Sequence, residues 1–134
     1  FSDNFDQGNF DTWQGDSNKF EINNDNQLQL NDTEAGQSAL YHNVTFTDSL
    51  IWNFDIKLRF SPSGGNNAKV LLAVDNPDLS KANGYILRLG QSGSDDAIDL
   101  IQLINGTETL IASGTPGFVA SSFYLNINSF IYLK

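Results

Sequence analysis

The residues that could do chemistry in this chain are one histidine, dispersed carboxylates and a set of aromatic side chains. The histidine, His42, lies in phase with Leu40, Val44 and Phe46, which favours a half-buried side chain held by a hydrogen bond over a catalytic base. The chain has no cysteine, and it contains no G-x-S-x-G, H-E-x-x-H or phosphate-loop motif. Thiol catalysis is therefore excluded, and a histidine-based hydrolase is strongly disfavoured.

Paired carboxylates are the main enzymatic alternative, because a glycosidase needs two of them facing one cleft. The three glutamates, Glu21, Glu34 and Glu108, lie far apart in the sequence, each at a turn or at the end of an expected strand. Asp55 projects from the polar side of the longest expected strand, but the positive charge of Lys57 on that side opposes a role as general acid. We therefore expect no catalysis and keep a degenerate glycoside hydrolase as an alternative.

Oxygen-rich segments could hold a hard cation, because Ca²⁺ takes about six to eight oxygen ligands from carboxylates, amides and carbonyls. Residues 3–6, 75–78 and 95–99 offer such oxygens, and none has the D-x-[DN]-x-[DN]-G spacing with a distal glutamate. The Gly-Ser-Asp run before residue 99 is also typical of a solvated turn. The candidate ligands of one structural calcium ion are therefore Asp3, Asn4 and Asp6, and we expect no other cofactor.

Aromatic side chains beside polar ones are typical of a cleft that binds sugars. Trp52 and Phe54 are expected in the core, because they lie on the fully apolar side of their strand. Trp13, which polar residues flank, and Tyr41 are candidates for stacking on sugar rings. Candidates for binding the sugar hydroxyls are Asn53, Asp55, Lys57, Arg59 and Arg88.

The elements that must position these residues are β-strands. The clearest runs from Leu50 to Phe60, where all six even positions are apolar and only one of the five odd positions is. This alternation places one side of the strand in the core and the other in solvent. We expect a hairpin between this strand and one over residues 69–74, across a turn-rich link.

Other strands follow from the same reasoning, and Asn105-Gly106 predicts a two-residue hairpin turn because both residues tolerate positive φ. Residues 98–104 are apolar on both sides, which predicts a central strand. One helical turn is expected over residues 76–83. The remaining strands are expected over residues 19–22, 27–31, 37–46, 84–90, 109–112 and 118–133.

The spacing of these strands over 134 residues predicts a single all-β domain, residues 1–134, built as an antiparallel two-sheet sandwich. A net charge of −9, from 7 basic and 16 acidic residues, opposes binding to a nucleic-acid backbone or to anionic lipid. No apolar stretch is long enough for a transmembrane helix, and no signal peptide lies within the chain as given.

Several motifs occur in a familiar order over roughly residues 1–118. They are Phe1-Ser2-Asp3-Asn4-Phe5, Trp13-Gln14-Gly15-Asp16, Leu28-Gln29-Leu30, Trp52-Asn53-Phe54, Gly84-Tyr85-Ile86-Leu87-Arg88-Leu89-Gly90 and Ser92-Gly93-Ser94-Asp95-Asp96-Ala97-Ile98. This order resembles the concanavalin A-like lectin/glucanase jelly-roll module at the front of bacterial surface proteins, some of which carry a lamin-tail domain. That superfamily includes lectins, carbohydrate-binding modules and glucanases. The glucanase strand, with two glutamates flanking an aspartate, has no match in this chain, so the resemblance implies no enzymatic role.

The resemblance implies a secreted, cell-surface or periplasmic jelly-roll module that binds a glycan or cell-surface polysaccharide without catalysis. The alternative of a different class is a structural or adhesion module that makes protein–protein contacts. The resemblance also leads us to expect further strands after residues 123–127, whereas this chain stops at Lys134. Missing strands would leave a sheet edge open, so we expect a homo-oligomer formed through the C-terminal strand.

Overall fold

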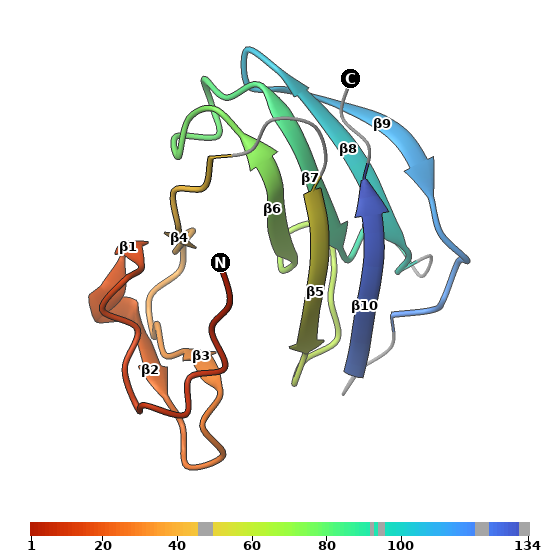
Figure 1. Ribbon diagram of the computed structural model, residues 1–134. Helices are drawn as coiled ribbons and strands as arrows, with labels where there is room; N and C mark the ends of the chain where they lie inside the picture. The colour runs from red at the N-terminus through yellow and green to blue at the C-terminus, as the bar shows by residue number, and fades with distance from the viewer. Residues whose placement is uncertain (46–49, 92, 94–95, 120–123, 132–134) are drawn as a thin grey trace. The chain divides into compact units, whose positions relative to one another are not determined.

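A computed structural model describes residues 1–45, 50–91, 93, 96–119 and 124–131 of the chain (Figure 1). Its regular elements are antiparallel β-strands and one short 3-10 helix, Ser17–Lys19, which confirms the predicted all-β class. The chain forms two compact units, residues 1–46 and 47–134, and each unit is described by itself. In the part of the chain that the structure describes, no helix has the length and apolar character needed to cross a membrane.

The N-terminal unit contains two small two-stranded sheets. Strand β1 (Gln14–Gly15) pairs with β4 (Leu40–Tyr41), and β2 (Phe20–Ile22) pairs with β3 (Leu28–Leu30). The β2–β3 hairpin is closed by Asn23, whose Oδ1 accepts hydrogen bonds from the backbone N–H groups two and four positions on, at 2.9 and 3.0 Å. The strand expected over residues 37–46 is much shorter in the structure, where β4 covers two residues.

The C-terminal unit begins with β5 (Leu50–Lys57), which pairs along its whole length with β10 (Tyr124–Ile131). Figure 1 shows the two strands side by side and antiparallel. The predicted hairpin between residues 50–60 and 69–74 is wrong, because β6 (Ala68–Val74) pairs with β7 (Gly84–Leu89) instead. The link after β5 carries the chain into another sheet, so β5 and β6 are not hydrogen-bonded neighbours.

Four consecutive strands form the larger sheet, in chain order. After β6 and β7 come β8 (Ile98–Ile104) and β9 (Thr107–Ser113). The predicted hairpin turn is confirmed, because Asn105 and Gly106 join β8 to β9 with φ values of 48° and 76°. The predicted central position of β8, between β7 and β9, is confirmed as well.

The segment between β6 and β7 is a turn rather than the expected helical turn. Its backbone makes two bonds of the i to i+3 kind, from Lys81 N–H to the Asp78 carbonyl and from Ala82 N–H to the Leu79 carbonyl. These bonds do not extend into a regular helix. A first-turn proline alone therefore does not make this segment helical.

The core of the C-terminal unit consists of two clusters on opposite faces of the larger sheet. Ile86 and Ile101, which are opposite each other in register, belong to the first cluster, together with Leu103 and Ala82. Strand residues alternate between faces, so Leu89 belongs to the other face. The second cluster contains Leu58, Leu89 and Val119, with Ile56, Phe60, Ala68, Val70 and Ile98 packed against it. Through Ile56 and Leu58, this cluster packs β5 on the larger sheet.

Candidate functional site

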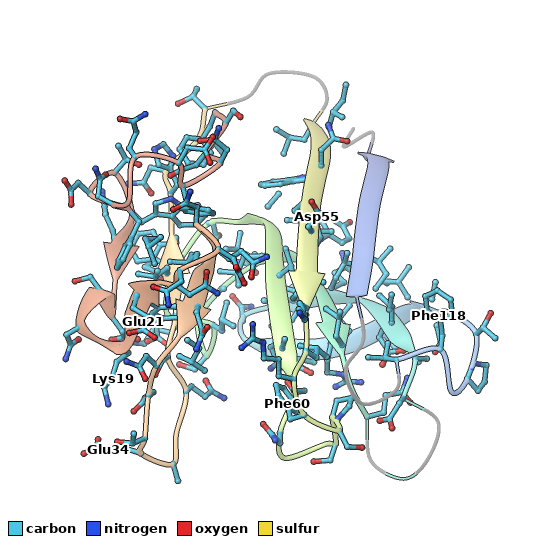
Figure 2. All side chains as sticks on the ribbon, turned by 90° about the horizontal axis from the view of Figure 1, so that it is seen from below. Lys19, Glu21, Glu34, Asp55, Phe60 and Phe118 are labelled. Atoms are coloured by element: carbon cyan, nitrogen blue, oxygen red, sulfur yellow. The ribbon has the colours of Figure 1, made fainter. Side chains whose placement is uncertain are left out.

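The exposed side of β5 carries the most regular set of polar residues in the described chain. Burial alternates at every position of this strand, half-buried at even residues and exposed at odd ones. The alternation continues past the strand end, where Leu58 is buried and Arg59 is exposed. We define the β5 polar row as Asn53, Asp55 and Lys57 of β5 together with Arg59, which lies in the bend after the strand. It faces away from the core because Ile56 and Leu58 pack inward; Figure 2 labels Asp55 on this strand.

Strand β10 places further residues opposite this row, and none of them was predicted as a site residue from the sequence. Its register places Asn128 opposite Asn53, Asn126 opposite Asp55 and Tyr124 opposite Lys57. Residues directly opposite each other in an antiparallel pair lie on the same face of a sheet. The alternation of polar or aromatic even positions with mostly apolar odd ones over residues 124–131 was the signal that could have found them.

Arg88, which was expected to help bind sugar hydroxyls, lies in an ion network on the larger sheet. Its Nη2 donates to Asp99 Oδ2 at 2.8 Å, and its Nη1 donates to Glu108 Oε2 at 3.2 Å. Arg88 is in phase with Ile86, whereas β5 packs on the opposite face of the sheet. The structure therefore does not bring Arg88 to the β5 polar row.

Asp99 is the centre of this ion network and is fully buried. Besides Arg88, its carboxylate accepts hydrogen bonds from Gln91 Nε2 and from Ser113 Oγ, both at 2.7 Å and both to Oδ1. Asp99 belongs to β8, within the strand predicted over residues 98–104, and its burial and its donors were not predicted; Asp95 lies outside the described residues. Three donors compensate the burial of the charge, which indicates a structural role.

Trp13 and Tyr41, the predicted aromatic platform, lie in the N-terminal unit. The β1–β4 register places the residue after Trp13, Gln14, opposite Tyr41. The indole Nε1 of Trp13 donates to Asp3 Oδ2 at 2.9 Å, and its ring meets the Phe1 ring edge-on at a centroid distance of 5.5 Å. Trp13 and Tyr41 are both half-buried, so each keeps part of its surface accessible.

His42 joins the same aromatic cluster. Its ring stacks on Phe1 at a centroid distance of 3.8 Å and meets Trp13 edge-on at 6.4 Å. The predicted half-burial is confirmed, but among the described residues the buried Nδ1 has no hydrogen-bond partner. Ring contacts rather than a hydrogen bond at this nitrogen hold the side chain.

The proposed calcium ligands form a loop with its own hydrogen bonds. Asp3 Oδ1 accepts from the Phe5 backbone N–H at 2.9 Å, while its Oδ2 is bound to Trp13. Asn4 Nδ2 donates to Asp6 Oδ2 at 2.7 Å. Over the ranges that the structure describes, no three His, Cys, Asp or Glu side chains are grouped so as to hold a metal ion. Calcium binding by this loop stays a prediction.

The other described oxygen-rich segment, residues 75–78, is stabilised in a similar way. Asp75 accepts hydrogen bonds from the backbone N–H and from Nδ2 of Asn83, at 2.7 and 2.9 Å, and these bonds lower the pKa of Asp75. Lys81 and Ser80 donate to Asp78, and they lower its pKa to about 2. Both carboxylates thus stabilise the turn between β6 and β7.

Lys19 organises a charged cluster in the N-terminal unit. Its Nζ lies 2.9 Å from Asp32 Oδ1 and 3.2 Å from Glu34 Oε2, and Figure 2 labels Lys19 and Glu34. Ser38 Oγ donates to Asp32 Oδ2. The bonds from Ser38, from the Glu34 backbone N–H and from Lys19 lower the pKa of Asp32 from 3.8 to about 2.

The chain matches no protein-family model, and comparisons with curated proteins and with solved structures give no match either. A functional conclusion therefore depends on the geometry of the residues themselves. The geometry brings Asn53, Asp55, Lys57 and Arg59 together in one exposed row. It leaves Arg88 in a separate ion network, and it places Trp13 and Tyr41 in the other unit.

Proposed function

We propose that this chain is a non-catalytic extracellular binding module of the jelly-roll type and that the β5 polar row binds a glycan. The observation that carries this proposal is the strict alternation of β5, which leaves every odd position exposed, the polar residues Asn53, Asp55 and Lys57 together with the apolar Ile51. A sheet face with amide, carboxylate and cationic groups can both donate to and accept from sugar hydroxyls.

The register of β10 supports the same surface. Asn126 and Asn128 lie opposite Asp55 and Asn53, so asparagines occupy positions of the same face on the neighbouring strand. The register also places Tyr124 opposite Lys57 near one end of the pair.

The ion network supports a non-catalytic function for the larger sheet. Asp99 and Glu108 both bind Arg88, and Glu108 also accepts from Lys69 Nζ at 2.7 Å. Asp99 is fully buried in this network, whereas a glycosidase carboxylate must reach its substrate in a cleft. The proposal also includes calcium binding by the loop at residues 3–6. Trp13 and Tyr41 are proposed as a second, aromatic contribution to glycan binding.

The test is binding to a panel of soluble polysaccharides by affinity electrophoresis, with and without Ca²⁺. We expect Asn53→Ala/Asp55→Ala to weaken binding at least tenfold, because both exchanged residues lie in the exposed row. Thr109→Ala, an exposed change on β9, is the matched control and should leave binding unchanged. Equal binding by the wild-type protein and the double variant would overturn the assignment of the site to β5. Loss of binding only in Trp13→Ala would move the site to the N-terminal unit.

A second candidate function, a protein–protein contact, is favoured by β9. All seven residues of this edge strand are exposed, including Leu110 and Ile111 with 57% and 50% of their surface accessible. Exposed apolar edge strands readily pair with another chain. We expect a second copy of this chain as the partner, because two copies of β9 can pair antiparallel and symmetrically about Leu110. Light scattering should then show a dimer that Leu110→Lys converts to a monomer, whereas a monomeric wild-type protein would refute this contact.

A further inference from the structure

The pairing of the basic side chains separates them into two groups. Lys19 is paired with Asp32, Lys69 with Glu108, Lys81 with Asp78, and Arg88 with Asp99 and Glu108, all at 3.2 Å or less. The chain has only seven basic residues against 16 acidic ones. An acidic chain of this kind offers a carboxylate to almost any cation on its surface.

Lys57 and Arg59 are the exceptions among the described basic residues. Both are exposed, and neither forms an ion pair with another described residue. They are two positions apart in the chain, Lys57 at the end of β5 and Arg59 in the bend that follows the strand. Two exposed cations without carboxylate partners in the described chain therefore lie close in sequence at one end of the proposed binding surface.

We propose that the ligand of the β5 polar row is an acidic polysaccharide and that Lys57 and Arg59 bind its carboxylate or sulfate groups. This inference rests on the proposed function of the same row and adds the charge class of the ligand. Charge-assisted hydrogen bonds to carboxylate and sulfate are about twice as strong as neutral ones. Arg59 can bind such a group through two parallel N–H donors, while Lys57 provides a point charge.

The rest of the row fits a sugar better than another polyanion. Asn53 and Asp55 lie on the same exposed face and carry groups that bind hydroxyls. A sugar has many hydroxyls, whereas a phosphate backbone or a polyacidic peptide has few. The net charge of −9 also opposes the high charge density of a nucleic acid. A polysaccharide with spaced negative charges places anions at the two cations and hydroxyls at the remaining residues.

The experiment compares polygalacturonate with its fully methyl-esterified form, which has the same backbone without the charge, by affinity electrophoresis of the full chain. Wild-type protein should bind polygalacturonate at least tenfold more tightly than the ester, and added salt should reduce this preference. Lys57→Gln/Arg59→Gln should remove the preference and leave binding to the ester unchanged. Lys81→Gln removes one surface cation, as the single change Lys57→Gln does, so these two variants are matched in net charge; Lys81→Gln should keep the preference and Lys57→Gln should lower it. Circular dichroism of all variants confirms that they fold.

The outcomes separate this inference from the proposed function. Equal binding of the acidic and the esterified polymer, with loss in Asn53→Ala/Asp55→Ala, would refute the charge class while supporting glycan binding. No binding to polygalacturonate by a protein that binds a neutral member of the polysaccharide panel would overturn the charge class alone, whereas no binding to any polymer of the panel would overturn both. Equal loss of polygalacturonate binding in Lys57→Gln and in Lys81→Gln would show a general charge effect and refute the role of the row. Tighter binding to poly-glutamate than to polygalacturonate would overturn the polysaccharide class.

Discussion

Exchange of Asp99 for Asn should destabilise the C-terminal unit far more than any change of an exposed charge. The Asp99 carboxylate is fully buried and accepts three hydrogen bonds, with Oδ1 bound to Gln91 and Ser113 and Oδ2 bound to Arg88. An asparagine has one acceptor oxygen and one donor nitrogen in these places. If the NH2 group of the asparagine turns toward Arg88, it faces a group that can only donate, and in either orientation the charge of Arg88 loses a partner.

The expected loss is about 3–5 kcal/mol of the free energy of unfolding, the range for breaking a buried ion pair by removal of one member. The matched control is Glu108→Gln, because Glu108 binds the same Arg88 but keeps 35% of its side chain exposed. An exposed pair contributes about 0–1 kcal/mol. The two changes remove the same charge from the same network, and they differ in burial.

The assay is urea unfolding, monitored by tryptophan fluorescence in the Trp13→Phe variant. In this variant Trp52 of the C-terminal unit is the single tryptophan. With a slope of about 2 kcal/mol per M of urea, the midpoint should fall by about 2 M in Asp99→Asn. Arg88→Met/Asp99→Leu, which removes both charges, should lose less than Asp99→Asn alone. A loss in Asp99→Asn no larger than that in Glu108→Gln would refute the view that burial makes this carboxylate critical.

Three further changes test other parts of the structure. Leu58→Ala, at a position 4% exposed in the second core cluster, should cost about 2–5 kcal/mol in the same urea assay, and a cost under about 1 kcal/mol would show that β5 is not packed on the larger sheet. The lowered pKa of Asp32 means that its bonds contribute stability above about pH 4, which is lost as the pH falls towards 2. In Asp32→Asn, the free energy of unfolding of the N-terminal unit, monitored by Trp13 fluorescence, should therefore depend less on pH over that acid range. An unchanged acid transition would contradict the contribution of Asp32 to stability. Gly106→Ala should destabilise the β8–β9 hairpin by more than about 1 kcal/mol, because Gly106 has φ 76° and a Cβ there would collide with the Ser80 carbonyl; an unchanged thermal midpoint would argue against this.

Short-range patterns in the sequence predicted the elements of the C-terminal unit well. The alternation over residues 50–60 indicated the buried and exposed sides of β5, and the apolar run at residues 98–104 matched β8 at both ends. Asn105-Gly106 predicted the hairpin turn because the required positive φ is a property of these two residues alone. Each of these features depends on neighbours within a few positions.

Pairings between distant segments could not be predicted in this way. The alternation of β5 shows that one side is buried, but it is equally compatible with β6 or β10 as the hydrogen-bonded neighbour. Asp99 follows a Gly-Ser-Asp run like that of an exposed turn, and its donors Arg88 and Ser113 come from the two adjacent strands. A buried charge of this kind becomes visible only when the register is known.

In the candidate site, too, local features could be predicted from the sequence and contacts between distant segments could not. The phase of the strand predicted that Asn53, Asp55, Lys57 and Arg59 are exposed, and the structure confirms the exposure of all four, three of them on β5 and Arg59 in the bend that follows. That Lys57 and Arg59 have no carboxylate partner among the described residues could not be predicted, because the partners of the other cations come from elsewhere in the fold. The sequence did not distinguish Arg88 from Lys57 and Arg59, yet Arg88 has two carboxylate partners in the structure.

The alternation along β5 determines which of its positions tolerate substitution. The fold depends on the inward positions, such as Ile56 and Leu58, whereas the outward positions are exposed and, among the described residues, belong to neither core cluster. Surface substitutions usually change stability by no more than about 0.5 kcal/mol. Replacement of the exposed residues Lys57 and Arg59 should therefore leave the fold intact. The same strand thus separates positions that tolerate substitution from positions that the core needs.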